Sequence, residues 1–253
     1  MINPMELAGK HYLVTGASSG LGRQTCITLS RLGARVSLIA RNKEKLDETI
    51  SMMDGKSHYD YPFDVNQVED IEGIVKKAVS KNGRLDGYVH CAGISTAKPL
   101  SLTKYNFMQE MMRIHVLSFV EFARCISKKK FSNEGGSMVA VSSAGTRHSD
   151  KGKTAYAAAK GALDAAVLPL AIELGEMRGI RVNTVNPGWI KTDMYYDFIR
   201  EFGQERMDEI EASHILGAAK PSDIAKVIAF LLSEASAKIT GQNIFTDSGW
   251  TIH

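Results

Sequence analysis

The stretch Thr15-Gly16-Ala17-Ser18-Ser19-Gly20-Leu21-Gly22 joins a short apolar run, residues 11–14, to an amphipathic run, residues 21–32. Glycines at these positions allow a sharp turn and let the backbone approach a pyrophosphate with no Cβ in the way. The start of the following helix adds free N–H groups and the positive end of the helix dipole. A glycine-rich turn is also found in tight strand–helix connections, but this order of strand, turn and helix predicts a dinucleotide-binding site.

The rest of the chain repeats the alternation of short apolar runs and longer amphipathic runs. Strands are predicted at residues 11–14, 34–40, 58–63, 86–91, 137–142, 181–185 and 243–246, and helices at residues 21–32, 43–53, 68–81, 104–129, 154–177 and 222–232. This alternation favours a parallel sheet with right-handed crossovers. Since no repeat or Pro/Ser-rich linker interrupts it, we expect a single α/β domain over residues 1–253, a doubly wound parallel sheet of the Rossmann type with helices on both faces.

One segment, at about residues 189–216, departs from the alternation. It is helical in propensity, rich in Tyr and Phe, and stands where the next strand would be expected. Insertions after strand ends at one rim of a sheet commonly build substrate sites. We therefore expect a substrate lid here, although an amphipathic helix packed on the sheet would show the same pattern.

The composition excludes several classes of protein. A hydrophobic fraction of 44% and a charged fraction of 23% are ordinary for a globular chain, and a net charge of +3 is too small to indicate a nucleic-acid partner. The longest stretch without Asp, Glu, Lys or Arg is 12 residues, short of the roughly 18 that a membrane helix requires, and no signal-peptide pattern is evident. Three widely spaced cysteines predict reduced thiols and a cytoplasmic location, and no His/Cys or carboxylate cluster has the spacing of a metal site.

The end of the second predicted strand bears on the choice of nicotinamide cofactor. An NAD-specific site would place a carboxylate there to hold the ribose 2′-hydroxyl. This chain has Ala40 instead, followed by Arg41, whose guanidinium can fork onto a 2′-phosphate. We expect NADP(H), the alternative being that Arg41 merely begins a solvated helical turn.

A second group of residues points to acid–base chemistry. Tyr156 and Lys160 are four residues apart in a predicted helix, so their side chains share one face. Bringing a tyrosine pKa from about 10 to near 7 takes about 4 kcal/mol, which one cation about 4 Å away supplies at an effective dielectric near 20. Such pairs are common on helix surfaces, but Ser143 ends the preceding strand, where its hydroxyl can bond a reacting carbonyl oxygen. Pro187-Gly188 directs the chain away from the sixth strand and toward the nicotinamide half of the cofactor.

In combination and order, these features resemble the single-domain short-chain dehydrogenase/reductases over essentially the whole chain. The resemblance implies that Ser143, Tyr156 and Lys160 are the catalytic serine, tyrosine and lysine, with Tyr156 and Lys160 also contacting the cofactor. It further implies cofactor contacts from the glycine-rich turn, from Asp64 and Val65 at the adenine, from Cys91, Ala92 and Gly93 beside the cofactor, and from Ile190 and Thr192 at the nicotinamide carboxamide.

Three positions depart from the family pattern. Cys91 stands where the family usually has Asn, and Ser248 replaces a glycine in Asp247-Ser248-Gly249. His115 stands where a helical Asn would be the fourth catalytic residue, helping to hold a water that relays protons to the lysine. A neutral imidazole can donate and accept, so it can keep such a relay, and the alternative is a buried histidine bonded to a carbonyl.

The resemblance implies an NADP-dependent carbonyl reductase or alcohol dehydrogenase acting on a small molecule, and a homotetramer. The layout is most similar to 3-oxoacyl-carrier-protein reductases, which makes a 3-oxoacyl thioester a candidate substrate, with sugar, polyol and steroid substrates open. The basic loop of Arg147, His148, Lys151 and Lys153 could receive a phosphate, a carboxylate or an acidic carrier protein, or be an ordinary charged loop. The competing hypothesis is an NADP-binding regulatory protein with little or no catalysis, and an epimerase or dehydratase is disfavoured because the chain lacks a larger substrate domain.

Overall fold

A computed structural model describes residues 3–252 and places seven parallel strands in one sheet, in the order β3-β2-β1-β4-β5-β6-β7. The strands are β1 (His11–Thr15), β2 (Arg35–Ala40), β3 (Tyr59–Pro62), β4 (Leu85–His90), β5 (Ser132–Val141), β6 (Arg181–Pro187) and β7 (Asn243–Thr246). All seven predicted strands are confirmed, although β5 starts earlier than expected. The strand order reverses between β1 and β4, and this switch point is where ligands of such sheets bind, beyond the carboxyl ends of the strands.

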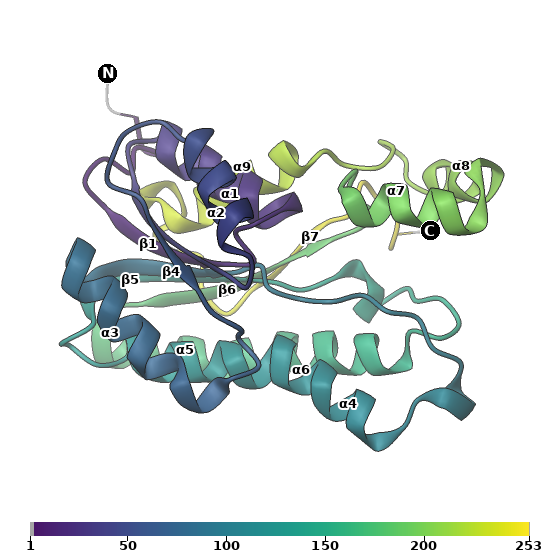
Figure 1. The fold of residues 1–253 in the computed structure, drawn as a ribbon, viewed down its shortest axis with the longest axis horizontal. Helices are drawn as coiled ribbons and strands as arrows, with labels where there is room; N and C mark the ends of the chain where they lie inside the picture. The colour runs from purple at the N-terminus through teal and green to yellow at the C-terminus, as the bar shows by residue number, and fades with distance from the viewer. Residues whose placement is uncertain (1–2, 253) are drawn as a thin grey trace.

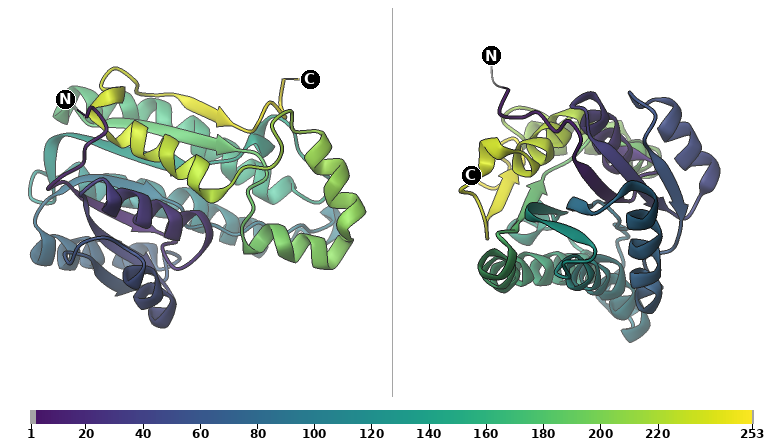
Figure 2. Two further views of the ribbon diagram at one scale, coloured as in Figure 1. Left: turned by 90° about the horizontal axis from the view of Figure 1, so that it is seen from above. Right: turned by 90° about the vertical axis from the view of Figure 1, so that its left-hand side faces the viewer.

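Helices cover both faces of the sheet, as expected for a doubly wound fold (Figures 1 and 2). On one face lie α1 (Gly20–Arg31), α2 (Lys43–Ser51) and α9 (Pro221–Leu232), and on the other lie α3 (Ile71–Asn82), α4 (Tyr105–Met112), α5 (Ser118–Ile126) and α6 (Thr154–Arg178). Each layer encloses its own hydrophobic core. The fold is therefore the single Rossmann-type domain that the alternating pattern predicts.

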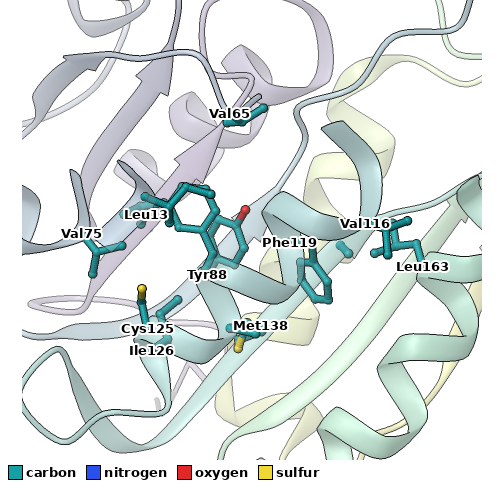
Figure 3. Packing of buried hydrophobic residues seen from close by; sticks show 14 of the residues in the cluster. Leu13, Val65, Val75, Tyr88, Val116, Phe119, Cys125, Ile126, Met138 and Leu163 are labelled. Atoms are coloured by element: carbon teal, nitrogen blue, oxygen red, sulfur yellow. The ribbon is translucent and has the colours of Figure 1, made fainter. Parts of the chain in front are cut away.

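The core under α3, α5 and α6 is built around Tyr88 (Figure 3). This side chain is fully buried on β4, and in the register of the sheet it is paired with Leu13 of β1. Its ring lies 6.0 Å from the ring of Phe119 and 4.8 Å from that of Phe122, measured between centroids. Truncating such a buried aromatic side chain typically costs about 3–5 kcal/mol, so this cluster fixes α5 against the sheet.

The helix predicted at residues 104–129 contains an irregularity that apolar spacing does not reveal. Between α4 and α5, residues Arg113–Leu117 form one π-helical turn, in which hydrogen bonds run from i to i+5. The Ile114 carbonyl in this turn accepts hydrogen bonds from His90 Nε2 (3.0 Å) and Ser118 Oγ (2.7 Å). The wider turn places His115 in the interior, where its side chain is only 1% exposed.

The long helix α6 packs on the sheet through Leu163, Val167 and Leu174. Within residues 3–252 it is the one helix long and apolar enough to cross a membrane, with a mean hydropathy of 1.3 over its most apolar 18-residue window. Core helices of globular domains pass the same test. One third of that window is buried inside the protein, whereas Leu168, Ile172 and Met177 on the outer face of α6 are exposed.

The segment at residues 189–216 forms two helices, α7 (Asp193–Phe202) and α8 (Gln204–Ala212), which extend beyond the carboxyl ends of the strands (Figures 1 and 2). A bridge between Ile190 and Ala219 closes its base, and a separate small core of Tyr195, Met207 and Ile210 holds the helices together. The segment thus has its own packing and is attached to the sheet at a narrow base.

The end of this segment is fixed to the C-terminal residues by aromatic contacts. His214 stacks on Trp250, with ring centroids 5.1 Å apart and planes 13° apart, and Trp250 also contacts His148, at 4.7 Å. His148 belongs to the loop after β5. Three segments that are distant in sequence therefore meet at one ring.

Candidate active site

The glycine-rich turn lies between β1 and α1 and has the shape of an anion cradle. Gly16 has a φ of +68°, and a Cβ there would lie 2.8 Å from the backbone nitrogen of Ala92. A Cβ on Gly22 would lie 2.1 Å from the Gly16 carbonyl oxygen, so neither position admits a side chain. Ser19 precedes α1 but its side chain does not cap the helix, which leaves the first N–H groups of α1 free to bind a pyrophosphate. The cradle fits the dinucleotide predicted from the sequence.

Other residues predicted to bind the cofactor lie around this turn. The Ala92 N–H donates to Thr15 Oγ1 (3.3 Å), which joins the end of β4 to the end of β1. The methyl group of Thr192 lies 3.4 Å from the position of a Cβ on Gly20, so the start of the inserted segment also reaches the turn. The ends of β1 and β4 and the segment that follows β6 therefore meet at the glycine-rich turn.

The adenine end of the predicted site lies at β2 and β3. Ala17 N–H donates to the Ile39 carbonyl (3.2 Å), which holds the glycine-rich turn beside the end of β2. Arg41 follows that strand, is exposed, and forms neither an ion pair nor a side-chain hydrogen bond within the described part of the chain. After β3, Asp64 Oδ1 accepts from the Asn66 N–H (2.9 Å), and the Val65 side chain is buried. Arg41 is thus free to meet a ligand.

Ser143, Tyr156 and Lys160 come together at the end of β5 and the start of α6. Lys160 is 4% exposed, and its Nζ donates to the Val141 carbonyl (2.6 Å) and lies 5.7 Å from the centroid of the Tyr156 ring. The Ser143 hydroxyl accepts from the Gly145 N–H (3.0 Å) at the start of a short turn. The hydroxyls of Ser143 and Ser95 both lower the pKa of the Tyr156 phenol.

The electrostatics of the pair follow from burial. Burial lowers the pKa of Lys160 to about 8, while Asp164 and Cys91 act in the opposite direction. Burial raises the pKa of Tyr156, and the hydroxyls of Ser143 and Ser95 lower it. At neutral pH the tyrosine is therefore protonated and able to give a proton, and the lysine is mostly a cation beside it.

His115 is buried directly under the turn formed by Cys91, Ala92 and Gly93. A Cβ on Gly93 would lie 2.5 Å from the His115 ring. Burial, together with the charge of Lys160, lowers the pKa of His115 to about 2, so the imidazole is neutral. Its Nε2 lies 3.0 Å from the Ile94 carbonyl oxygen and 3.4 Å from the Ile94 nitrogen. In the tautomer that donates to the nearer carbonyl, Nδ1 is a buried acceptor with no hydrogen-bond partner within residues 3–252. The structure therefore contains the carbonyl hydrogen bond expected of a buried histidine that serves only packing. It also contains a ring nitrogen, Nδ1, that remains available as an acceptor.

Two further buried residues near the site belong to no motif. His90, at the end of β4, has Nδ1 2.6 Å from Tyr88 Oη and 3.1 Å from Thr15 Oγ1, and burial lowers its pKa to about 3. Asp164 is four residues after Lys160 on α6, and its Oδ2 accepts from Asn186 Nδ2 (2.8 Å). Asp164 could have been found from the sequence, because it stands four residues after Lys160 in a predicted helix.

No metal site accompanies these residues. Among residues 3–252, no group of three or more His, Cys, Asp or Glu side chains is placed to hold a metal ion. The three cysteines, Cys26, Cys91 and Cys125, are all unpaired thiols. The geometry is that of a dinucleotide-binding domain with a tyrosine, a lysine and a serine beside its cradle.

Comparison with known proteins agrees with this geometry. Residues 16–251 match the family described as enoyl-(acyl carrier protein) reductase. A 3-oxoacyl-[acyl-carrier-protein] reductase from Thermotoga maritima is 32% identical over 250 residues, covering 98% of this chain and 100% of that protein. A glucose 1-dehydrogenase from Gluconobacter oxydans is 31% identical over 254 residues, covering 98% and 94%. A 7α-hydroxysteroid dehydrogenase solved with NADH and 7-oxo glycochenodeoxycholic acid superposes with a TM-score of 0.90 at 26% identity, covering 98% of each chain.

The chain belongs to the short-chain dehydrogenase/reductase family. Its relatives are oxidoreductases, and the family uses the nicotinamide cofactors NAD or NADP with small-molecule substrates. The predicted fold and the predicted family are both confirmed.

Proposed function

We propose that this protein is an NADP(H)-dependent reductase that interconverts a carbonyl compound and a secondary alcohol. The observation that carries the proposal is the convergence of Ser143, Tyr156 and Lys160 beside the glycine cradle. These three side chains supply a hydrogen-bond donor, a proton donor and a cation, which are the groups that carbonyl reduction requires of a protein.

When bound, the nicotinamide supplies or accepts the hydride. Tyr156 gives a proton to the oxygen that becomes the alcohol, and Ser143 holds that oxygen through a hydrogen bond as charge develops. Lys160, 5.7 Å from the tyrosine ring, stabilises the phenolate left behind by about 3 kcal/mol at an effective dielectric near 20. This is about two units of tyrosine pKa and opposes burial, which leaves the pKa of Tyr156 in the free protein above its usual value and not near 7.

We assign His115 to the supply of protons to Lys160. Its neutral state and its unpartnered Nδ1 support this role, because an acceptor buried beside the lysine can hold a water that donates to it. The bond from Nε2 to Ile94 orients the ring for this purpose.

The cofactor choice rests on Arg41, which stands exposed and unpaired at the end of β2 with Ala40 in place of a carboxylate. A guanidinium there favours a 2′-phosphate. The hydroxysteroid dehydrogenase with a similar structure was solved with NADH, so relatives with this fold differ in cofactor. The proposed NADP(H) site comprises Thr15, Gly16, Ser18, Ser19, Gly20, Leu21, Gly22, Arg41, Asp64, Val65, Cys91, Ala92, Gly93, Tyr156, Lys160, Pro187, Gly188, Ile190 and Thr192.

For the substrate, a 3-oxoacyl thioester stands first, because a carrier-protein reductase is among the relatives that match the full length of the chain. Sugar, polyol and steroid carbonyls are the alternatives. The segment at residues 189–216 is the proposed lid, and it exposes apolar side chains that would cover an apolar part of the substrate. These are Met194, Tyr196 and Phe202.

A homotetramer in the cytoplasm completes the proposal. Apolar side chains remain exposed on the outer face of α6 and at the start of α5, and a surface of this kind is typical of a subunit contact. They are Leu117, Val120, Leu168, Ile172 and Met177. The free thiols of the three cysteines fit a reducing compartment.

The test is oxidation of NADPH and of NADH with a panel of ketones, sugars and 3-oxoacyl thioesters. Turnover with NADPH, lost in the Tyr156→Phe variant, is the expected result. Tight NADPH binding with no turnover of any carbonyl would favour the regulatory alternative instead. Thermal stabilisation by each candidate in the presence of NADPH ranks the substrates independently of turnover.

A further inference from the structure

The basic loop between Ser143 and Tyr156 divides into residues that face different parts of the molecule. The guanidinium of Arg147 lies on the Phe245 ring, 3.9 Å from its centroid, and His148 contacts Trp250. Lys151 is exposed. Lys153 alone of the four turns toward the site, with Nζ 5.6 Å from the centroid of the Tyr156 ring. The Tyr156 ring therefore has two lysine ammonium groups at nearly the same distance from its centroid.

Lys153 is held in place but not neutralised. Its Nζ donates to the carbonyl oxygen (3.1 Å) and to the hydroxyl (3.0 Å) of Ser95, and within residues 3–252 no carboxylate lies within ion-pair distance of it. The loop that carries Ser95 is itself fixed, because the Lys98 N–H donates to the Gly152 carbonyl (2.9 Å). An ammonium group has three donors, so one remains for a ligand.

The surroundings of Lys153 favour an anion. The side chain is half-buried, so its charge has lost part of its hydration, and this burial lowers the pKa of Lys153. Asp150 and Glu201 act in the opposite direction, but both are exposed and screened by water. A partly desolvated cation with only dipolar partners gains a charge-assisted hydrogen bond when a carboxylate arrives.

We propose that Lys153 and Ser95 form a subsite for a carboxylate that the substrate carries close to its reacting carbonyl. This inference rests on the proposed interconversion of a carbonyl and a secondary alcohol. It makes oxo acids and the corresponding hydroxy acids the substrates in place of a 3-oxoacyl thioester, whose acyl group carries no free carboxylate. The short distance between Lys153 and the Tyr156 ring limits the number of atoms between the two groups of the substrate. The carboxylate must reach Lys153 while the carbonyl oxygen reaches Tyr156.

The test compares acetoacetate with its uncharged methyl ester, methyl acetoacetate, as substrates with NADPH. The measured quantity is the ratio of kcat/KM for the acid to that for the ester. In Lys153→Met this ratio should fall at least tenfold, as expected for loss of a charge-assisted contact, and Lys153→Arg should restore most of it. The matched control Lys151→Met removes an equal charge from the same loop and should leave the ratio unchanged. A ratio in Lys153→Met within threefold of the wild type overturns the inference.

A binding measurement separates this inference from the proposed function. With NADPH present, acetoacetate should raise the melting temperature of the wild type more than the ester does, and this difference should disappear in Lys153→Met. Turnover of the ester with no preference for the acid in either measurement overturns the subsite and leaves the reductase intact. Selective stabilisation by the acid without turnover of either compound supports the subsite and contradicts the proposed reaction.

Discussion

The imidazole of His115 stands edge-on to the ring of Tyr156, with centroids 5.7 Å apart and planes at 87°. This contact joins the π-helical turn to the start of α6, two elements that are separated in the chain by α5, β5 and the loops that flank β5. One of the three residues that depart from the family pattern therefore contacts the residue that donates the proton in the proposed reaction.

Replacing Tyr156 by Phe removes the proton donor and keeps the ring that packs against His115. We expect kcat to fall by about 10²–10⁴-fold, the usual contribution of a positioned acid, with the Kd for NADPH nearly unchanged. Steady-state kinetics and a cofactor titration check this. More than about a tenth of the wild-type kcat would remove Tyr156 from the mechanism.

His115→Asn restores the residue usual in the family and should remain active, whereas His115→Leu should lose kcat with little change in cofactor affinity. The reason is that leucine of similar bulk fills the space but cannot hold a water beside Lys160. Both variants are measured with the same substrate and with NADPH titration as the control for folding. Full activity in His115→Leu would show that the histidine serves only packing.

Arg41→Ala should weaken NADPH binding by about 10- to 100-fold, the cost of about 1.5–3 kcal/mol for a lost charge-assisted contact, and leave NADH binding unchanged. Titration of the variant with both cofactors provides its own control, since only NADPH carries the 2′-phosphate. Equal losses for the two would mark Arg41 as structural, and a wild type that binds NADH and excludes NADPH would reverse the assignment.

Buried histidines whose pKa is lowered by burial, His90 and His115 among them, make the protein sensitive to acid. Burial lowers the pKa of His115 to about 2 and that of His90 to about 3, whereas both titrate near 6.5 when unfolded. As pH falls below about 6.5 the unfolded chain binds protons that the folded chain does not, so the free energy of unfolding decreases by about 1 kcal/mol per pH unit for each histidine. Denaturant unfolding from pH 7 to 4 should show this slope, and His115→Asn should reduce it. An equal slope in the variant would contradict the pKa assignment.

Asp164→Asn should alter the pH profile and not merely the rate. Lys160 has a pKa of about 8, and Asp164 raises it, so loss of the carboxylate lowers it further. Because the ammonium form is the active one, activity should decline with rising pH, and in the variant this decline should begin at lower pH. Glu173→Gln, at an exposed position of the same helix, is the matched control. A decline at the same pH in Asp164→Asn would show that the carboxylate serves only Asn186.

Much of this fold was predictable because buried parallel strands read as continuous apolar runs. The early start of β5 was not, since Ser132, Asn133 and Glu134 are polar. Of these three only Ser132 is paired with β4, and the pairing is then interrupted until Ser137. The π-helical turn was equally hidden, because a wider hydrogen-bond ring leaves the apolar spacing of α4 and α5 almost unchanged.

The site divides in the same way. The glycine cradle and the Tyr156–Lys160 pair depend on spacing within a few residues, so sequence alone places them. The contact of His90 with Thr15 depends on the register of β4 beside β1, and the bond from Asn186 to Asp164 depends on how α6 lies over β6. Such contacts between residues far apart in the sequence form only once the sheet has formed, and no local sequence pattern predicts them.

The two tryptophans of the chain mark the two ends of the segment at residues 189–216. Trp189 packs against Phe198 at its beginning, and Trp250 stacks on His214 at its end. The protein therefore carries two natural fluorophores at the two ends of the proposed lid. Trp189 lies beside the phenyl ring of Phe198, and Trp250 lies beside the imidazole of His214. A ligand that repositions α7 and α8 would change the fluorescence emission of one or both tryptophans. Ligand binding can therefore be followed in unlabelled protein, and the variants Trp189→Phe and Trp250→Phe would show at which end of the segment the change occurs.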